Sequence, residues 1–86
     1  MKDVRYSRAA AKTLRRMPAN TARTIRAKVS AYAEDPASQA NNVSALKGSD
    51  ALRLRVGDWR VLMRDGVVID VIEVGPRGGI YGRGRA

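Results

Sequence analysis

The spacing of hydrophobic residues changes near the middle of the chain. Before Pro36, hydrophobic side chains recur every three or four residues, which is typical of helices that bury one face. From Ala51 onward they alternate with polar residues, which is typical of strands. Helices followed by strands predict an α+β domain in which the helices pack against a sheet.

The first part of the chain predicts a short strand and a helix. Val4 and Tyr6 alternate with polar neighbours and indicate the strand. Ser7 is suited to cap a helix over residues 8–17. The two faces of this helix differ in character, with an apolar face (Ala10, Leu14 and Met17) and a basic face (Arg8, Lys12, Arg15 and Arg16).

Prolines delimit the second helix. Pro18 ends the first helix and can open the second, with Asn20 as an alternative cap. The second helix is expected to extend to about Glu34, because Pro36 stops it. Its buried face consists of Ala22, Ile25, Val29 and Tyr32. Residues 37–45 are rich in Ser and Asn and predict a polar loop.

Two turn sequences divide the rest of the chain into three strands, over residues 51–56, 59–64 and 67–74. Gly57-Asp58 fits a two-residue turn with glycine first, and Asp65-Gly66 is a strong signal for a type I′ turn. The first strand needs a pairing partner, so we expect it to join this sheet. The predicted fold is a small single domain with an antiparallel sheet, in the order β-α-α-β-β-β, and both helices on one face.

The hairpin at Gly57-Asp58 gathers arginines on one face of the sheet. Its register sets Arg55 opposite Arg60. Alternation then places Arg53, Arg55, Arg60 and Arg64 on one face, and Leu54, Val56, Trp59, Val61 and Met63 on the other. Like charges directly opposite destabilise a strand pair, and the only acid nearby is Glu73 in the third strand. A bound polyanion would turn this repulsion into attraction, whereas the alternative interpretation is a solvated basic face.

One acidic residue does not fit the alternation. Asp70 falls on the face covered by the helices, among Val68, Ile72 and Val74. A β-bulge, a position at the sheet edge or a hydrogen-bonded buried carboxylate would each explain it.

The net charge narrows the classes of partner. Seventeen Lys and Arg residues against eight Asp and Glu give a net charge of +9, and thirteen of the basic residues are Arg. Arginine favours planar, bidentate contacts with phosphate, so the excess indicates a nucleic-acid partner. The absence of Cys excludes disulfides and thiolate metal sites and is compatible with the cytoplasm, where we expect the protein. Apolar runs of at most three residues exclude a membrane-spanning segment, and no cofactor is expected.

The end of the chain adds chemistry to this charge. The Gly/Pro-rich residues 74–81 can bring Arg77 and Tyr81 to the edge of the arginine face. A tyrosine beside a basic sheet can stack on a base or transfer a proton, although a surface or packing tyrosine is the simpler interpretation. Arg83 and Arg85 belong to a flexible basic tail over residues 83–86, which we expect to bind RNA without specificity.

In this combination of elements the chain resembles the RelE-type toxins of bacterial toxin–antitoxin pairs. The similarity covers nearly the whole chain, from a strand and two helices to a meander and a final Val-Gly-x-Arg element followed by Tyr. We therefore assign residues 1–82 to a RelE-like toxin domain. The matching residues are Leu46-Lys47-Gly48, Arg53, Arg55, Trp59-Arg60, Arg77 and Tyr81.

The resemblance implies an endoribonuclease, or mRNA interferase, that cuts messenger RNA in the ribosomal A site without a metal. The 2′-hydroxyl of the RNA would attack the adjacent phosphate. Arg60 would hold that phosphate, Arg53 and Arg55 would neutralise its developing charge, and Arg77 would stabilise the leaving 5′-oxygen. Tyr81 would act on the 2′-hydroxyl or stack on a base, and Arg64, with the tail, would bind RNA.

One departure from the family pattern affects these roles. Well-known members carry Lys at the positions of Arg53 and Arg55, and Arg is effectively always protonated. The two residues would then act by electrostatic stabilisation rather than proton transfer.

The resemblance also implies partners and two alternative functions. The expected partners are a cognate antitoxin, messenger RNA and the ribosome, with no membrane, and the toxin–antitoxin complex would bind its own operator through the antitoxin. One alternative is a ParE-like relative that poisons DNA gyrase. Such relatives generally lack the set Arg60, Arg77 and Tyr81, which this chain contains. The other alternative is a nucleic-acid-binding module without catalytic activity.

Overall fold

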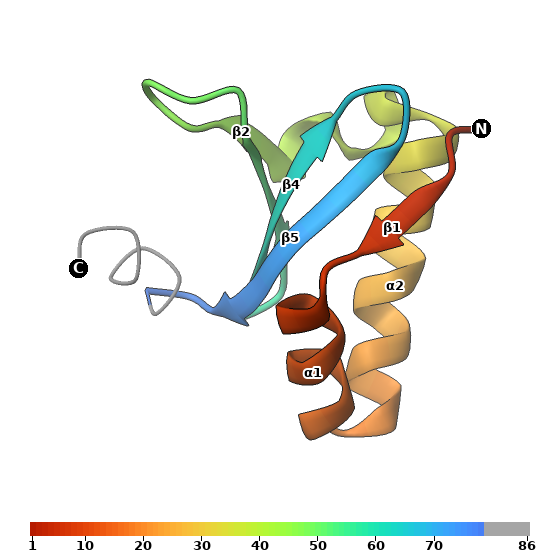
Figure 1. The fold of residues 1–86 in the computed structure, drawn as a ribbon, viewed down its shortest axis with the longest axis vertical. Coiled ribbons are helices and arrows are strands. Elements are labelled where there is room, and N and C mark those ends of the chain that lie inside the picture. The colour runs from red at the N-terminus through yellow and green to blue at the C-terminus, as the bar shows by residue number, and fades with distance from the viewer. Residues whose placement is uncertain (79–86) are drawn as a thin grey trace.

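Two helices cover one face of a five-stranded sheet (Figure 1). The structure is a computed structural model and describes residues 1–78. The elements are β1 (Val4–Tyr6), α1 (Arg8–Arg16), α2 (Ala19–Glu34), a 3₁₀ helix η1 (Pro36–Asn42), β2 (Val43–Ala45), β3 (Leu52–Val56), β4 (Trp59–Asp65) and β5 (Ile69–Pro76). The strand order is β1-β5-β4-β3-β2. The predicted α+β class and the placement of both helices on one face are confirmed.

The helix boundaries follow the caps and prolines of the sequence. The Oγ of Ser7 accepts a hydrogen bond from the Ala10 N–H at 3.0 Å, which satisfies one free donor of the first turn of α1. Pro18 occupies the N-cap position of α2, so Asn20 lies inside the helix and does not cap it. The core between the helices and the sheet includes Ala10 and Leu14 of α1 and Ile25, Val29 and Tyr32 of α2.

The sheet differs from the predicted one in its outer strands. It is mixed rather than antiparallel, because β1 pairs in parallel with β5, with Val4 opposite Ile69. Both helices lie between these strands in the chain, so no hairpin forces an antiparallel pairing. The predicted loop over residues 37–45 is also wrong, since it contains η1 and β2. The pairing of β2 with β3 sets Val43 opposite Leu54, and three residues are too few to show a strand periodicity in sequence.

The two predicted turns had different outcomes. Gly57 opens the β3–β4 turn with a φ of 60°, and Arg55 lies opposite Arg60 as predicted. A type I′ turn requires positive φ at both central residues, and neither Asp65 nor Gly66 has one. The β4–β5 connection instead runs through residues 66–68, and β5 begins two residues later than predicted, at Ile69. Its tip is Val67, whose side chain is almost fully exposed.

A β-bulge in β5 accounts for Asp70. Leu62 of β4 pairs with Glu73 and the next residue, Met63, pairs with Val71, so Ile72 is the additional residue of the bulge. The bulge changes which residues of β5 face the helices. Asp70 is consequently exposed and lies 3.7 Å from Arg5, whereas its neighbours Ile69 and Val71 are buried. Of the three explanations considered for Asp70, the bulge is the one observed.

A polar cluster joins the N-terminus to α2 and to the end of β4. Tyr32 donates its hydroxyl hydrogen to Asp65 Oδ2 at 2.7 Å, and Lys2 forms a salt bridge with the other carboxylate oxygen of Asp65. The hydrogen bond from Lys2 and, to a smaller extent, that from Tyr32 hold the pKa of Asp65 below its usual value. Burial and the hydrogen bond to Asp65 raise the pKa of Tyr32 to about 12. The Asp65 carboxylate thus adds stability at neutral pH that is lost as the pH falls through its lowered pKa.

This cluster predicts a stability change at alkaline pH. The pKa of Tyr32 is raised on folding, so its contribution is complete below pH 10, the ordinary value, and is lost as the pH rises through about 12. At pH 8, Tyr32→Phe should lower the free energy of unfolding by roughly 1.5–3 kcal/mol, the range for a hydrogen bond to a charged group. The gap between the two proteins should narrow above pH 10. Urea unfolding from pH 8 to 12 measures it, and a constant gap would contradict the role of the phenol proton.

Candidate functional site

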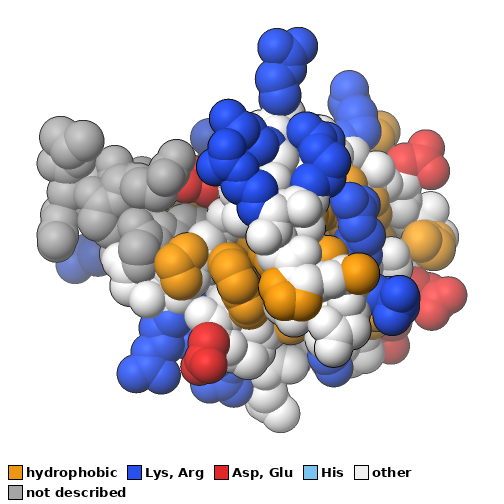
Figure 2. Space-filling model, turned by 90° about the horizontal axis from the view of Figure 1, so that it is seen from below, with side chains coloured by type: hydrophobic (Ala, Val, Ile, Leu, Met, Phe, Trp, Pro, Cys, Tyr) orange, Lys and Arg blue, Asp and Glu red, His pale blue; other side chains and the backbone are white. Residues whose placement is uncertain are grey.

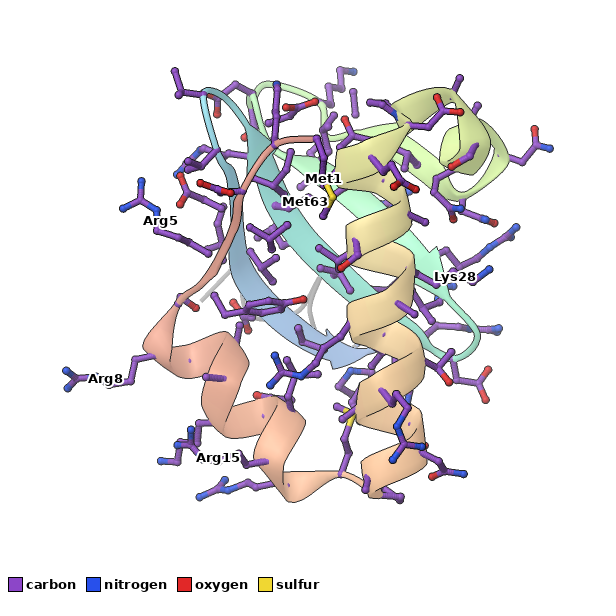
Figure 3. The ribbon with its side chains drawn as sticks, turned by 90° about the vertical axis from the view of Figure 1, so that its right-hand side faces the viewer. Met1, Arg5, Arg8, Arg15, Lys28 and Met63 are labelled. Carbon is purple, nitrogen blue, oxygen red and sulfur yellow. The ribbon has the colours of Figure 1, made fainter. Side chains whose placement is uncertain are left out.

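Four arginines lie on the sheet face that points away from α1 and α2. Arg53 and Arg55 belong to β3, and Arg60 and Arg64 belong to β4. Their chain neighbours Leu54, Val61 and Met63 are fully buried on the opposite face. Figure 3 shows Met63 directed toward α2, while basic side chains of β1 and the helices, such as those labelled Arg5, Arg8, Arg15 and Lys28, extend outward. The predicted arginine face is therefore distinct from the basic faces of the helices.

Three of these arginines line one hollow. It measures about 170 Å³ and is bounded by Arg53, Arg55, Arg60, Asn41, Asn42 and Ser44. The three arginines were predicted to act together, but the polar residues, which come from η1 and β2, were not. The richness of residues 37–45 in Ser and Asn was visible in the sequence. Their place beside β3, however, depends on the pairing of β2.

The guanidinium groups in this hollow are held by neutral oxygen atoms. Arg55 Nη2 donates to Asn42 Oδ1 at 3.2 Å, and Arg53 Nη2 donates to Ser44 Oγ at 3.4 Å. Arg60 Nη1 donates to two backbone carbonyls, those of residues 57 and 59, each at 2.9 Å. Amide, hydroxyl and carbonyl oxygens fix the direction of a guanidinium without cancelling its charge. Arg55 and Arg60 thus present positive charge to the hollow in a defined arrangement.

Arg64 shares this face but lies outside the hollow. Its Nε donates to Asp50 Oδ1 at 3.0 Å in an exposed salt bridge, and its partner across the strand is Asp70. Its positive charge is therefore balanced by nearby acids, which distinguishes it from Arg55 and Arg60 of the hollow. Glu73 pairs with Leu62, which in turn pairs with Arg53, so Glu73 lies on the arginine face as expected.

Arg77 lies at the same end of the sheet as Arg55 and Arg60. The backbone N–H of Arg77 donates to the carbonyl oxygen of Asp58 at 2.8 Å, which fastens the end of β5 to the β3–β4 turn. Gly75, opposite Arg60 on β5, carries no side chain. The other residues singled out near the C-terminus, Tyr81, Arg83 and Arg85, lie outside the described residues.

Trp59 marks an apolar surface beside this end of the sheet. Trp59 lines two hollows, of about 230 and 380 Å³. Thr24 and Val56 also line the first hollow, and Met17 and Pro76 also line the second. Figure 2 shows the molecule from this end, with hydrophobic side chains gathered near the centre of the view and Lys and Arg side chains around them. Trp59, predicted as a core residue, is therefore only partly buried and packs at the margin of the core.

Residues 1–78 give no indication of a metal site or a membrane span. They contain no group of three or more His, Cys, Asp or Glu side chains that could hold a metal ion. Within the same range, no helix has the length and apolar character needed to cross a bilayer.

Comparison with protein families decides the membership of the chain. Residues 4–81 match the family described as the ParE toxin of the type II toxin–antitoxin system, parDE. The chain belongs to this family. It is accordingly a RelE/ParE-superfamily toxin, as the sequence resemblance indicated. A comparison with individual curated proteins gave no match.

Solved structures similar to this ParE-family toxin are RelE toxins. The toxin in the RelE–RelB complex of the archaeon Pyrococcus horikoshii is 25% identical, with a TM-score of 0.77, over 91% of this chain and 97% of that one. The isolated Escherichia coli RelE toxin is 20% identical, with a TM-score of 0.73, over 99% of this chain and 96% of that one. A chain of the intact E. coli RelBE complex is 22% identical, with a TM-score of 0.72, over 88% of this chain and 96% of that one. The two E. coli structures show the shared fold.

The opposed arginines predict a gain in stability when one is neutralised. Arg55→Gln should raise the free energy of unfolding by about 0.2–1 kcal/mol at low salt, because like charges directly opposite destabilise a strand pair. The gain should shrink in 0.5 M NaCl, which screens the repulsion. Urea unfolding at both salt concentrations measures it. Arg64→Gln is the matched control, since it removes an arginine already paired with Asp50. A loss of stability common to both variants would rule out the repulsion.

Proposed function

We propose that this toxin is a metal-independent endoribonuclease that cleaves messenger RNA in the ribosomal A site. The observation that supports this best is the hollow in which Arg53, Arg55 and Arg60 converge. Guanidinium groups bind phosphate with several parallel hydrogen bonds. The neutral oxygens that accept from Arg55 and Arg60 leave the charge and the remaining N–H donors of these groups available. A basic protein that only binds RNA needs no such convergence, because scattered charges on its surface are enough.

The proposed reaction uses the RNA's own nucleophile. The 2′-oxygen forms a bond to phosphorus, the bond to the 5′-oxygen breaks, the 2′-hydroxyl loses its proton and the leaving oxygen gains one. Arg60 holds the scissile phosphate, while Arg53 and Arg55 stabilise the negative charge that develops on it. Arg77 stabilises or protonates the leaving 5′-oxygen, and Tyr81 acts on the 2′-hydroxyl or stacks on a base. Arg64 and the tail residues Arg83 and Arg85 contact the RNA backbone.

We also propose a cognate antitoxin as partner. Two of the similar structures described above are complexes of a RelE toxin with its RelB antitoxin. An acidic segment laid over or beside the arginine hollow would neutralise it and keep RNA out. The antitoxin would carry the complex to its operator, because the arginines of the toxin are then covered.

The second candidate function is poisoning of DNA gyrase. The observation that favours it is the family description itself, which names the ParE toxin. Against it stands the set Arg60, Arg77 and Tyr81, which ParE-like relatives generally lack. A supercoiling assay with purified gyrase distinguishes the two activities.

The endoribonuclease proposal predicts that activity depends on the arginine face and not on total charge. Wild-type protein added to translating ribosomes should create new RNA 5′ ends within codons. Arg60→Ala should reduce them by about 10²-fold or more, the loss typical of a transition-state donor. Arg15→Ala, which removes the same charge from the exposed face of α1, should cleave and remain toxic. Equal loss in both folded variants would refute the proposal, and gyrase inhibition without new 5′ ends would favour the second candidate.

The role proposed for Tyr81 predicts different effects of two substitutions. If its hydroxyl transfers a proton, Tyr81→Phe should lower cleavage by ~10²–10⁴-fold and leave ribosome binding nearly unchanged. If its ring only stacks, Tyr81→Phe should keep most activity and Tyr81→Ala should weaken binding by roughly 1–3 kcal/mol. Arg77→Ala serves as a control that impairs the leaving group without removing the ring. Wild-type cleavage by both tyrosine variants would remove Tyr81 from the site.

A further inference from the structure

Arg55 and Arg60 place two like charges next to each other in the hollow. The two residues are direct cross-strand partners, so their Cβ atoms are about 4.5–5.5 Å apart. Two guanidinium groups on such neighbouring positions repel each other in the absence of an anion. A site that binds phosphate between them needs both groups held apart and both still charged.

The hydrogen bonds of the two arginines point them in different directions. Arg60 is held by the carbonyls of residues 57 and 59, at the hairpin turn of its own strand pair. Arg55 is held by Asn42, from the segment next to the other edge of β3. The two anchors direct the guanidinium groups toward different partners, and both arginines line the 170 Å³ hollow.

A buried glutamine orients the amide of Asn42. Asn42 Nδ2 donates to Gln39 Oε1 at 3.3 Å, so Asn42 Oδ1 is the atom that accepts from Arg55. Gln39 is 7% exposed and is the only buried polar or charged residue among residues 1–78. Its position on the 3₁₀ helix η1 connects the packed interior to the arginine hollow. Asn42 is thus held in place by the interior and not by solvent-exposed contacts alone.

The neutral anchors of Arg55 and Arg60 differ from the carboxylate partners of three other basic residues. Lys2, Arg5 and Arg64 form salt bridges with Asp65, Asp70 and Asp50. Within residues 1–78, neither Arg55 nor Arg60 forms a salt bridge. A carboxylate at the position of Asn42 would hold Arg55 as well as the amide does, but it would cancel the charge that an anion needs.

We propose that Asn42 is a positioning residue that holds Arg55 apart from Arg60 through a neutral oxygen, so that both guanidinium groups bind one RNA phosphate in the hollow. This inference rests on the proposed endoribonuclease function and assigns to that site a residue outside the set predicted from sequence. Asn42 itself does not touch the reacting atoms. It acts through Arg55, and its amide rather than its size is the property that matters.

The experiment separates the position of Arg55 from its charge. The probe is a short single-stranded 2′-O-methyl RNA, which cannot be cleaved by attack of its 2′-oxygen, and its affinity for the full chain is measured at several salt concentrations. Asn42→Asp keeps the acceptor and cancels the charge. It should weaken binding several-fold at low salt and reduce the slope of log affinity against log salt by about 0.7, the value for one lost phosphate contact on a single strand.

Two further variants complete the test. Asn42→Ala keeps the charge and removes the anchor, so the salt slope should stay at the wild-type value while kcat for ribosomal cleavage falls and KM changes little. Asn20→Asp makes the same chemical change at an exposed position on α2, on the helix side of the sheet, and should bind like wild type. If Asn42→Asp does not fold, Ser44→Asp replaces it. This substitution on the edge strand β2 introduces a carboxylate into the same hollow and should weaken binding in the same way.

The outcomes also separate this inference from the function on which it rests. Equal binding by Asn42→Asp and Asn20→Asp would overturn the inference, even if the wild-type protein cleaves RNA. Wild-type kcat in Asn42→Ala would overturn it as well. If the wild-type protein cleaves no RNA but Asn42→Asp still loses the salt-dependent contact, the endoribonuclease function fails and the assignment of Asn42 to an anion site stands.

Discussion

The register between β3 and β4 is the constraint on which the rest of the molecule depends. One face of this strand pair supplies the core residues Leu54, Val61 and Met63, and the other supplies Arg53, Arg55 and Arg60. A slip of one residue would exchange the two faces and bury arginines under the helices. Core packing and the placement of the arginines are therefore one property. Burial of the apolar face against α1 and α2 stabilises the same register that places Arg55 opposite Arg60.

The distribution of acids shows how the fold tolerates this concentration of charge. The eight acidic residues of the chain are too few to pair with seventeen basic ones. Three salt bridges of residues 1–78 join basic side chains outside the hollow to Asp50, Asp65 and Asp70. Inside the hollow, Arg55 and Arg60 donate hydrogen bonds to neutral oxygens instead. The repulsion that remains there is compatible with a site that is completed by an anionic partner.

The sequence predicted the elements whose signals are local or strongly periodic. Ser7 and Pro18 gave the helix boundaries, and Gly57 gave the hairpin register and with it the shared face of the arginines. The prediction failed where pairing between distant segments decides the structure. The strand β2 and the polar residues Asn42 and Ser44 are brought to the hollow by their contact with β3, which no local pattern reveals. The bulge at Ile72 likewise depends on how β5 meets β4.

The parallel pairing of β1 with β5 has a consequence for the order of folding. The first strand of the described residues, Val4–Tyr6, finds its partner only in Ile69–Pro76, near their other end. During translation α1 and α2 can form early, but this edge of the sheet cannot close until β5 has left the exit tunnel. Since β5 also covers Ala10 and Leu14 of α1, the core stays incomplete until then. The complete fold can therefore form only after nearly all of the described residues have left the exit tunnel.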